Sequence, residues 1–261
     1  MILAREIHKA EVAVDDTITV LTITLSNMAE AILSPKMFSI AGIDLPDTPL
    51  IQATMSFARH HLDDVAYNHV LRCTLFGTAI SDRVPALQNR DRELHVVAAL
   101  LHDLGWDRTG KFVSTDKRFE VDGANAAREF VRSSAFKHDW DERRVQILWD
   151  AVALHTQPDI AWHKEAEVKA TQLGIIADFG GVAGMRSFGY ELSDTEWQAI
   201  CKEYPRVGFK EGVKQILCGL CTSKPATTFD NFVGDFGEHF AVPGYSRQGR
   251  RFVDLFASME N

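Results

Sequence analysis

Apolar positions recur every three or four residues along most of the chain, which is the spacing of one helix face. The most apolar stretch runs from Glu93 to Asp107 and predicts a buried helix. An imidazole and a carboxylate, His102 and Asp103, follow each other near its end, and Gly105 is predicted to stop it. A charged pair at the end of a buried helix destabilises a protein unless a neighbouring group or a cation compensates it.

The same periodicity predicts about nine to ten helices in all, joined by short loops. Asp47 or Thr48 is expected to cap the first clear helix, and Pro49 suits its first turn. Further helices are predicted over 63–80, from 120, over 141–155 and 165–181, from 193, and three times more before the end of the chain. These elements predict an all-α protein, with a single domain over 46–261.

Residues 1–45 form an N-terminal extension of uncertain structure. Within it, Thr17–Leu25 alternates β-branched apolar residues with Thr, which is typical of a strand. No other stretch resembles a partner for it, and a lone strand is not stable. Two alternatives therefore remain for this segment: a helix, or a strand that pairs with another subunit.

Charge and composition restrict the possible partners. The 261 residues are 46% hydrophobic, and 28 basic against 36 acidic residues give a formal charge of −8. This balance argues against general nucleic-acid binding, which needs a basic surface. No run of 18 apolar residues predicts a transmembrane helix, the N-terminus is too charged for a signal peptide, and four cysteines form no disulfide framework. We expect a cytoplasmic protein with a small-molecule substrate, no nucleic acid, no membrane, and a possible homo-oligomeric state.

Four polar side chains project from apolar helices: His69, His102, Asp103 and Asp178. Each would be costly to bury without a partner. Two imidazoles and two carboxylates suit a divalent cation that keeps positions open for water or substrate. The alternative without a metal is that His102 caps its helix while Asp103 binds a nearby Arg.

The order of these residues resembles the HD-domain superfamily of metal-dependent hydrolases. The strings that carry the resemblance are NHVLRCTLFG around His69, VAALLHDLG around His102 and GIIADFGG around Asp178. The resemblance implies a helical bundle that holds the cation with His69, His102, Asp103 and Asp178. It covers about 47–185, which we take as the metal-site core, and leaves 186–261 as additional helices.

A finer resemblance is to the cyanamide-hydratase-like branch of that superfamily. It rests on Phe119-Glu120-Val121-Asp122-Gly123-Ala124 after the His-Asp loop and on His155 in the next helix. The neighbours of His155 and the C-terminal quarter depart from the branch. The branch implies a hydratase or hydrolase of a small nitrogen-containing molecule, with one divalent ion, most naturally zinc, or else iron or manganese.

Catalytic roles are expected for two residues outside the ligand set. A divalent cation lowers the pKa of bound water toward neutrality, and His155 and Glu120 are candidates to move the protons that follow. His155 could instead orient a ligand, and Glu120 could satisfy a helix N-terminus. Lys111, Arg72 and Arg108 could bind an anionic substrate group or be solvated or structural.

Three other functions compete with a hydratase. A nucleotide phosphohydrolase would need a basic pocket, and the cations of this chain are scattered. A di-iron oxygenase would need two more imidazoles; of His138, His155 and His163, only His155 lies well within a helical stripe. A binding module would have no evident use for four ligands. The CxxC at Cys218 and Cys221 could be half of a zinc site, but its apolar context indicates core.

Overall fold

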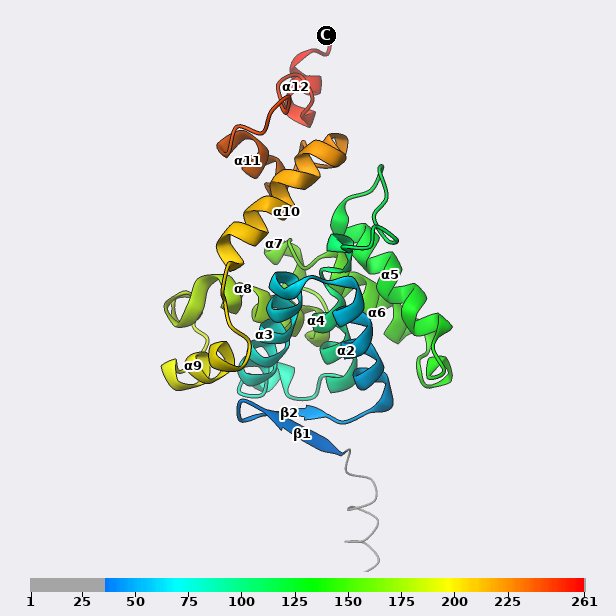
Figure 1. Cartoon of the computed structure of the whole chain (residues 1–261), viewed down its shortest axis with the longest axis vertical. Helices are drawn as coiled ribbons and strands as arrows, with labels where there is room; N and C mark the ends of the chain where they lie inside the picture. The colour runs from blue at the N-terminus through cyan, green and yellow to red at the C-terminus, as the bar shows by residue number, and fades with distance from the viewer. Residues whose placement is uncertain (1–35, 261) are drawn as a thin grey trace, which may run out of the picture. The chain divides into compact units, whose positions relative to one another are not determined.

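A computed structural model of the chain describes residues 36–260 (Figure 1). The chain divides into two units, Met1–Met37 and Phe38–Asn261, and all described helices belong to the second. The stretch Thr17–Leu25, with its open choice between strand and helix, lies outside the described residues.

The described residues form an all-α architecture, which confirms the predicted fold class. Their eleven α-helices include one that the sequence did not predict, the four-residue α7. The elements are β1 (Met37–Ile40), β2 (Ile43–Pro46), α2 (Pro49–His61), α3 (Asp64–Ser81), α4 (Arg92–Leu101), α5 (Phe119–Ser133), α6 (Glu142–Ala153), α7 (Pro158–Ala161), α8 (Ala166–Ser187), α9 (Asp194–Glu203), α10 (Phe209–Ser223), α11 (Phe232–His239) and α12 (Phe252–Ala257). No described helix combines the length and apolar character that crossing a membrane would require.

Strands β1 and β2 form a two-stranded sheet that the hydrophobic pattern did not reveal. The turn between them consists of Ala41 and Gly42, whose φ angles of 52° and 81° are both positive. A two-residue hairpin turn of this kind needs positive φ at both positions, and it normally shows Asn or Gly there. Ala at the first position gives no such signal, so the hairpin is hard to read from the sequence.

Helix starts agree well with the sequence. Thr48 caps α2 by accepting a hydrogen bond from the Ile51 amide, and Pro49 is the first helical residue. Ser193 and Glu196 form the predicted capping box at α9. Side chains also cap four more helices, namely α3, α4, α6 and α11, through Asp63, Asp91, Asp141 and Asn231.

Helix α4 is buried along its length and contacts α2, α3, α5, α6 and α8, as expected for the most apolar segment (Figure 1). It ends earlier than predicted, at Leu101, so that His102 is its C-cap residue and a short 3₁₀ turn follows at Leu104–Trp106. The role predicted for Gly105 was wrong, because this residue does not have a positive φ. A Cβ atom at Gly105 would instead overlap the backbone of Phe119, so the glycine lets α5 approach the end of α4.

Helices α3 and α8 cross closely at two glycines. A Cβ atom on Gly77 would lie 2.8 Å from the Ala170 carbonyl oxygen, and one on Gly174 would overlap the carbonyl of Cys73. The contact brings His69, two turns before Gly77, opposite Asp178, one turn after Gly174. The backbones must therefore stay this close for the imidazole and the carboxylate to meet.

The C-terminal helices α10 and α11 build a second apolar cluster together with Phe119 of the core. Its other buried members are Phe209, Val213, Leu217, Leu220, Cys221 and Val233. The thiol of Cys221 points to the Val233 carbonyl oxygen at 3.3 Å, and all four cysteines are free. The CxxC sequence therefore belongs to this packing, as its apolar context indicated.

We predict that Gly174→Ala lowers the free energy of unfolding by about 3 kcal/mol, because the new methyl group meets backbone that cannot move aside. Gly184→Ala in the same helix is the matched control, since nothing lies within 4 Å of its Cβ position. The control should be neutral or stabilising by about 0.5–1 kcal/mol. Urea denaturation measures both values, and equal stabilities would contradict the close crossing.

Candidate metal centre

His69 lies on α3, facing α8, and is 1% exposed. Its Nδ1 is 2.7 Å from Oδ2 of Asp178. The pKa of Asp178 would be raised by burial alone, but hydrogen bonds from His69 and Arg72 hold it well below its usual range, so the carboxylate accepts. Nδ1 of His69 must therefore donate, which leaves the lone pair of the neutral ring on Nε2.

His102 and His155 stand at the C-terminal ends of α4 and α6, where helix carbonyls lack amide partners. Nδ1 of His102 is 2.8 Å from the Ala99 oxygen, and Nδ1 of His155 is 2.6 Å from the Val152 oxygen. Because a carbonyl can only accept, both Nδ1 atoms carry hydrogen. The neutral form of each ring again presents a lone pair at Nε2.

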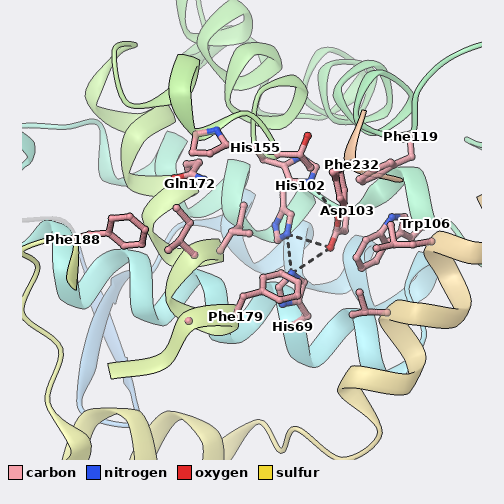
Figure 2. Close-up of a pocket in the computed structure, with 17 residues that line it drawn as sticks. His69, His102, Asp103, Trp106, Phe119, His155, Gln172, Phe179, Phe188 and Phe232 are labelled. Atoms are coloured by element: carbon pink, nitrogen blue, oxygen red, sulfur yellow. Dashed lines mark hydrogen bonds and ion pairs between the residues drawn. The ribbon is translucent and has the colours of Figure 1, made fainter. Parts of the chain in front are cut away.

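These lone pairs converge on Asp103 (Figure 2). Nε2 of His69 lies 3.3 Å from Nε2 of His102 and 3.5 Å from Oδ2 of Asp103, and Nε2 of His102 lies 3.2 Å from the same oxygen. Ligands about 2.1 Å from a tetrahedral ion are separated by about 3.4 Å from one another. The triangle therefore has the dimensions of three corners of such a site.

The carboxylate of Asp103 has no hydrogen-bond partner among the described residues, although the residue is only 1% exposed. Nε2 of His155 approaches its other oxygen, Oδ1, at 3.5 Å. Lone pairs on nitrogen and oxygen repel when no hydrogen lies between them, and an unpaired buried carboxylate is strongly destabilising. A cation at this place removes both penalties, so the residues fit the divalent ion that the sequence predicts.

The pKa shifts follow from burial and these neighbours. Burial alone would raise the pKa of Asp103, but the surrounding imidazoles hold it well below its usual range. Burial lowers the pKa of His102. It would also lower that of His155, but the carboxylates of Asp103 and Glu120 raise the pKa of His155 above its ordinary value. Asp103 is therefore ionised at neutral pH, as a metal ligand must be.

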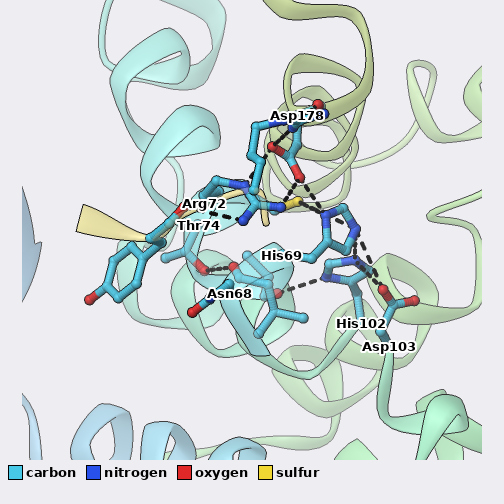
Figure 3. A network of polar contacts seen from close by, with 12 residues as sticks. Asn68, His69, Arg72, Thr74, His102, Asp103 and Asp178 are labelled. Carbon is cyan, nitrogen blue, oxygen red and sulfur yellow. Dashed lines mark hydrogen bonds and ion pairs between the residues drawn. The ribbon is translucent and has the colours of Figure 1, made fainter. Parts of the chain in front are cut away.

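Asp178 does not join the convergent atoms but binds the opposite nitrogen of His69, Nδ1, and extends the network to two arginines (Figure 3). Arg72 donates to both of its oxygens, from Nε and Nη2, each at 2.8 Å. Arg206 Nη1 binds Oδ1 as well. The structure thus brings together three of the four predicted ligands, His69, His102 and Asp103; the assignment of Asp178 as a ligand stays a prediction.

The predicted shuttle residue Glu120 is 1% exposed and occupies the first turn of α5. Its Oε1 accepts hydrogen bonds from Thr156 and Arg118, and Oε2 accepts another from Arg118. Burial would raise the pKa of Glu120, but Arg118 and the nearby His155 lower it. Glu120 therefore acts on its surroundings as a fixed negative charge beside His155.

A cavity of about 450 Å³ opens beside the convergent atoms. Its described lining contains no Lys or Arg. It consists of His69, His102, Asp103, Trp106, Phe119, His155, Thr156, Pro158, Gln172, Ile175, Ile176, Phe179, Gly180, Phe188, Val213, Leu217 and Phe232. Of the three cations considered for an anionic group, Arg72 is buried against Asp178, Arg108 binds the His60 oxygen, and Lys111 lies over the Phe112 ring.

Two residues near the cluster were not predicted to have a role. Gln172 lines the cavity, and its Oε1 accepts a hydrogen bond from the Trp162 indole. Cys73 follows His69 by one helical turn, and its Sγ lies 3.7 Å from the His69 Nε2. Burial raises the pKa of this thiol well above its usual range, so it is a poor ligand in its neutral form. In the sequence, only the spacing of four residues from His69 indicated that Cys73 would lie near the cluster.

The imidazoles proposed for a second ion are not gathered here, apart from His155. His138 lies in a 3₁₀ turn at Lys137–Asp139 and His163 follows α7; both are exposed, and neither lines the cavity. Apart from Cys73, only Asp103 Oδ1 and His155 among the described residues add potential ligand atoms to the triangle of His69, His102 and Asp103 Oδ2. Of the three imidazoles considered for a second ion, the described structure therefore brings only His155 to the cluster.

Comparison with known families identifies the segment that holds the site. The family model of the HD domain matches residues 66–179, which is less than half of the chain but includes His69, His102, Asp103, His155 and Asp178. No curated protein matches the chain. The match implies a divalent-metal site and metal-dependent hydrolase-type activity. The segment 66–179, which contains the whole ligand cluster, is thus similar to the HD domain, and this similarity supports the resemblance that its His and His-Asp motifs indicated.

Proposed function

We propose that the chain is a metal-dependent hydratase or hydrolase of a small, uncharged, nitrogen-containing molecule such as a nitrile, a cyanamide or an amide. The observation that carries the proposal is the convergence of Nε2 of His69 and His102 on the Asp103 carboxylate, which accepts no regular hydrogen bond from the described residues. These three residues would hold one divalent ion. Two imidazoles and one carboxylate suit zinc, with iron or manganese as alternatives.

The Nδ1 partners fix the directions of these ligands. Asp178 holds the ring of His69 with a charge-assisted hydrogen bond, and the Ala99 carbonyl holds that of His102. Partners of this kind keep the ligand tautomer and orientation constant. We therefore infer that Asp178 is a positioning residue. The alternative is that Asp178 is a fourth ligand, and the Asp178→Asn variant distinguishes the two roles.

When bound, the ion supplies a Lewis acid and a water molecule that is easily deprotonated. The chain supplies proton transfer at Nε2 of His155, which faces Oδ1 of Asp103 while Nδ1 is fixed by Val152. Glu120 stabilises the protonated form of His155 by its charge. The apolar cavity wall excludes bulk water and so strengthens these electrostatic interactions.

The cavity also argues for the class of substrate. A nucleotide phosphohydrolase needs cations that bind phosphate oxygens, and among the residues that the structure describes no Lys or Arg lines this cavity. An uncharged substrate requires no such groups. The amide of Gln172 offers a neutral hydrogen-bond donor instead, because its oxygen is already occupied by the donor-only indole of Trp162.

Metal content provides the first test. We predict one equivalent of a divalent metal per chain in the purified protein, measured by elemental analysis. His102→Ala and Asp103→Ala should each lose it, because two remaining ligands cannot hold the ion. His60→Ala is the control, since this imidazole is exposed and outside the cluster. Two equivalents of iron would contradict the single-ion proposal and favour the oxygenase.

Replacement of the metal by cobalt distinguishes the two possible roles of Asp178, positioning residue and ligand. In cobalt-substituted protein, Asp178→Asn should weaken metal affinity roughly 10- to 100-fold but keep the visible absorption spectrum of the saturated site. A changed spectrum at saturation would make Asp178 a ligand. Circular dichroism must accompany this variant, because it leaves Arg72 buried with a weaker partner.

His155→Ala is predicted to keep the fold and most of the metal while turnover falls roughly a hundredfold or more, as for loss of a general acid–base. His163→Ala, an exposed imidazole beyond the cavity, should leave turnover unchanged. Steady-state kinetics and metal analysis measure the two effects separately. Loss of the metal from His155→Ala would instead show that this residue is a ligand.

The origin of the new oxygen tests the reaction class. We predict activity under strict exclusion of dioxygen and, in ¹⁸O-labelled water, a labelled product, because one redox-inert ion suffices for hydration or hydrolysis. A screen under argon should include nitriles, cyanamides, amides and nucleoside phosphates, with zinc restored to chelated protein. Turnover that stops without dioxygen would exclude the hydratase, and phosphate release alone would select the phosphohydrolase.

A further inference from the structure

The cavity beside the cluster has a few polar groups in a mostly apolar wall. The polar lining residues are the convergent imidazoles, Asp103, Thr156 and Gln172. The other described lining side chains are aliphatic or aromatic, apart from a glycine and a proline. A substrate as small as cyanamide would leave most of this wall without a contact.

The cavity as a whole is far larger than the reacting group needs. Its volume of about 450 Å³ falls within the range of about 300–1,000 Å³ that is typical of sites burying a drug-sized ligand. Apolar surface left in contact with water is a cost that a bound apolar group removes. The walls therefore point to a ligand group that fills this space.

The wall is assembled from two parts of the chain. The segment 66–179 contributes Trp106, Phe119 and Phe179 (Figure 2). It also contributes Ile175. The helices that follow it contribute Val213 and Leu217 of α10, which are 5% and 2% exposed, and Phe232 of α11. Rings stand on several sides of the cavity, and Phe179 is half exposed at its surface.

We propose that the substrate carries an aromatic or branched aliphatic substituent directly on its small polar group, and that this substituent binds between α8 and α10. This inference rests on the proposed function, because the polar group must reach the metal ligands. The free NH₂ of Gln172 donates a hydrogen bond to an acceptor atom on the polar group, while the substituent contacts Ile175, Val213 and Leu217. The proposed substrate is uncharged, since the lining contributed by residues 36–260 offers no Lys or Arg.

Hydroxamic acids test this proposal by binding alone, since their head chelates a divalent ion whatever substituent it carries. Titration calorimetry of the zinc-loaded protein compares acetohydroxamic acid with benzohydroxamic acid. The phenyl ring should tighten binding by about tenfold or more, because burial of roughly 100 Å² of apolar surface is favourable. Equal affinities of the two compounds would overturn the proposal.

The two proposals fail differently in this experiment. If neither compound binds the zinc-loaded protein more tightly than the zinc-free protein, the metal centre itself is wrong. If acetohydroxamic acid binds in a zinc-dependent manner but the phenyl ring adds nothing, the metal centre stands and the apolar subsite is wrong. Tight binding of the phenyl compound only with zinc supports both.

Variants on one helix locate the substituent. Leu217→Phe should narrow the cavity and remove most of the advantage of benzohydroxamic acid while the affinity for acetohydroxamic acid stays unchanged. Gln215→Phe is the matched control, since it places the same ring on the exposed face of α10. Leu217→Ala should instead favour a naphthyl hydroxamic acid over the phenyl one. Thermal unfolding checks that each variant is folded, and an unchanged preference in both Leu217 variants would overturn the proposal.

Discussion

The buried carboxylate of Asp178 is the interaction on which the rest of this structure depends. It joins α3, through His69 and Arg72, to α8, and Arg206 adds the segment that leads into α10. Arg72 is fully buried and also donates to the carbonyls of Tyr204 and Pro205. Charges taken out of water are tolerated only when every one is paired, and loss of one member leaves a penalty of about 3–5 kcal/mol.

This network explains how an apolar bundle can present polar atoms in a defined direction. The Asp178 carboxylate determines which ring nitrogen of His69 carries the hydrogen. The free carbonyls at the ends of α4 and α6 do the same for His102 and His155. Helix ends are suited to this task, because their last carbonyls have no amide partners within the helix. The cluster therefore takes its geometry from backbone that is already fixed by core packing.

Much of the fold was readable from the sequence, because helical periodicity and capping residues act locally. Thr48, Ser193 and the long apolar stretch before His102 each predicted an element that the structure contains. The hairpin was missed because Ala41 conceals a positive φ. The role of Gly105 was misjudged because a close approach between α5 and the end of α4 is a tertiary contact that leaves no local pattern.

The candidate site shows the same division. Residue types and order predicted His69, His102 and Asp103, which meet in space. The sequence could not show whether Asp178 would lie on the Nε2 side or the Nδ1 side of the His69 ring. This depends on the distance between α3 and α8 and on Arg206, far along the chain. Gln172 appeared only as part of an apolar stripe, and its orientation became visible through the indole of Trp162.

The cavity wall that α10 and α11 contribute has a consequence for how such a protein diversifies. The ligand cluster belongs to the segment 66–179, whereas Val213, Leu217 and Phe232 lie beyond it and carry no metal-binding group. Substitutions at these three positions can change the shape of the cavity while the proposed metal ligands stay the same. Selection can therefore vary this part of the wall, whereas Arg206 of the same segment is constrained by the Asp178 carboxylate that it binds.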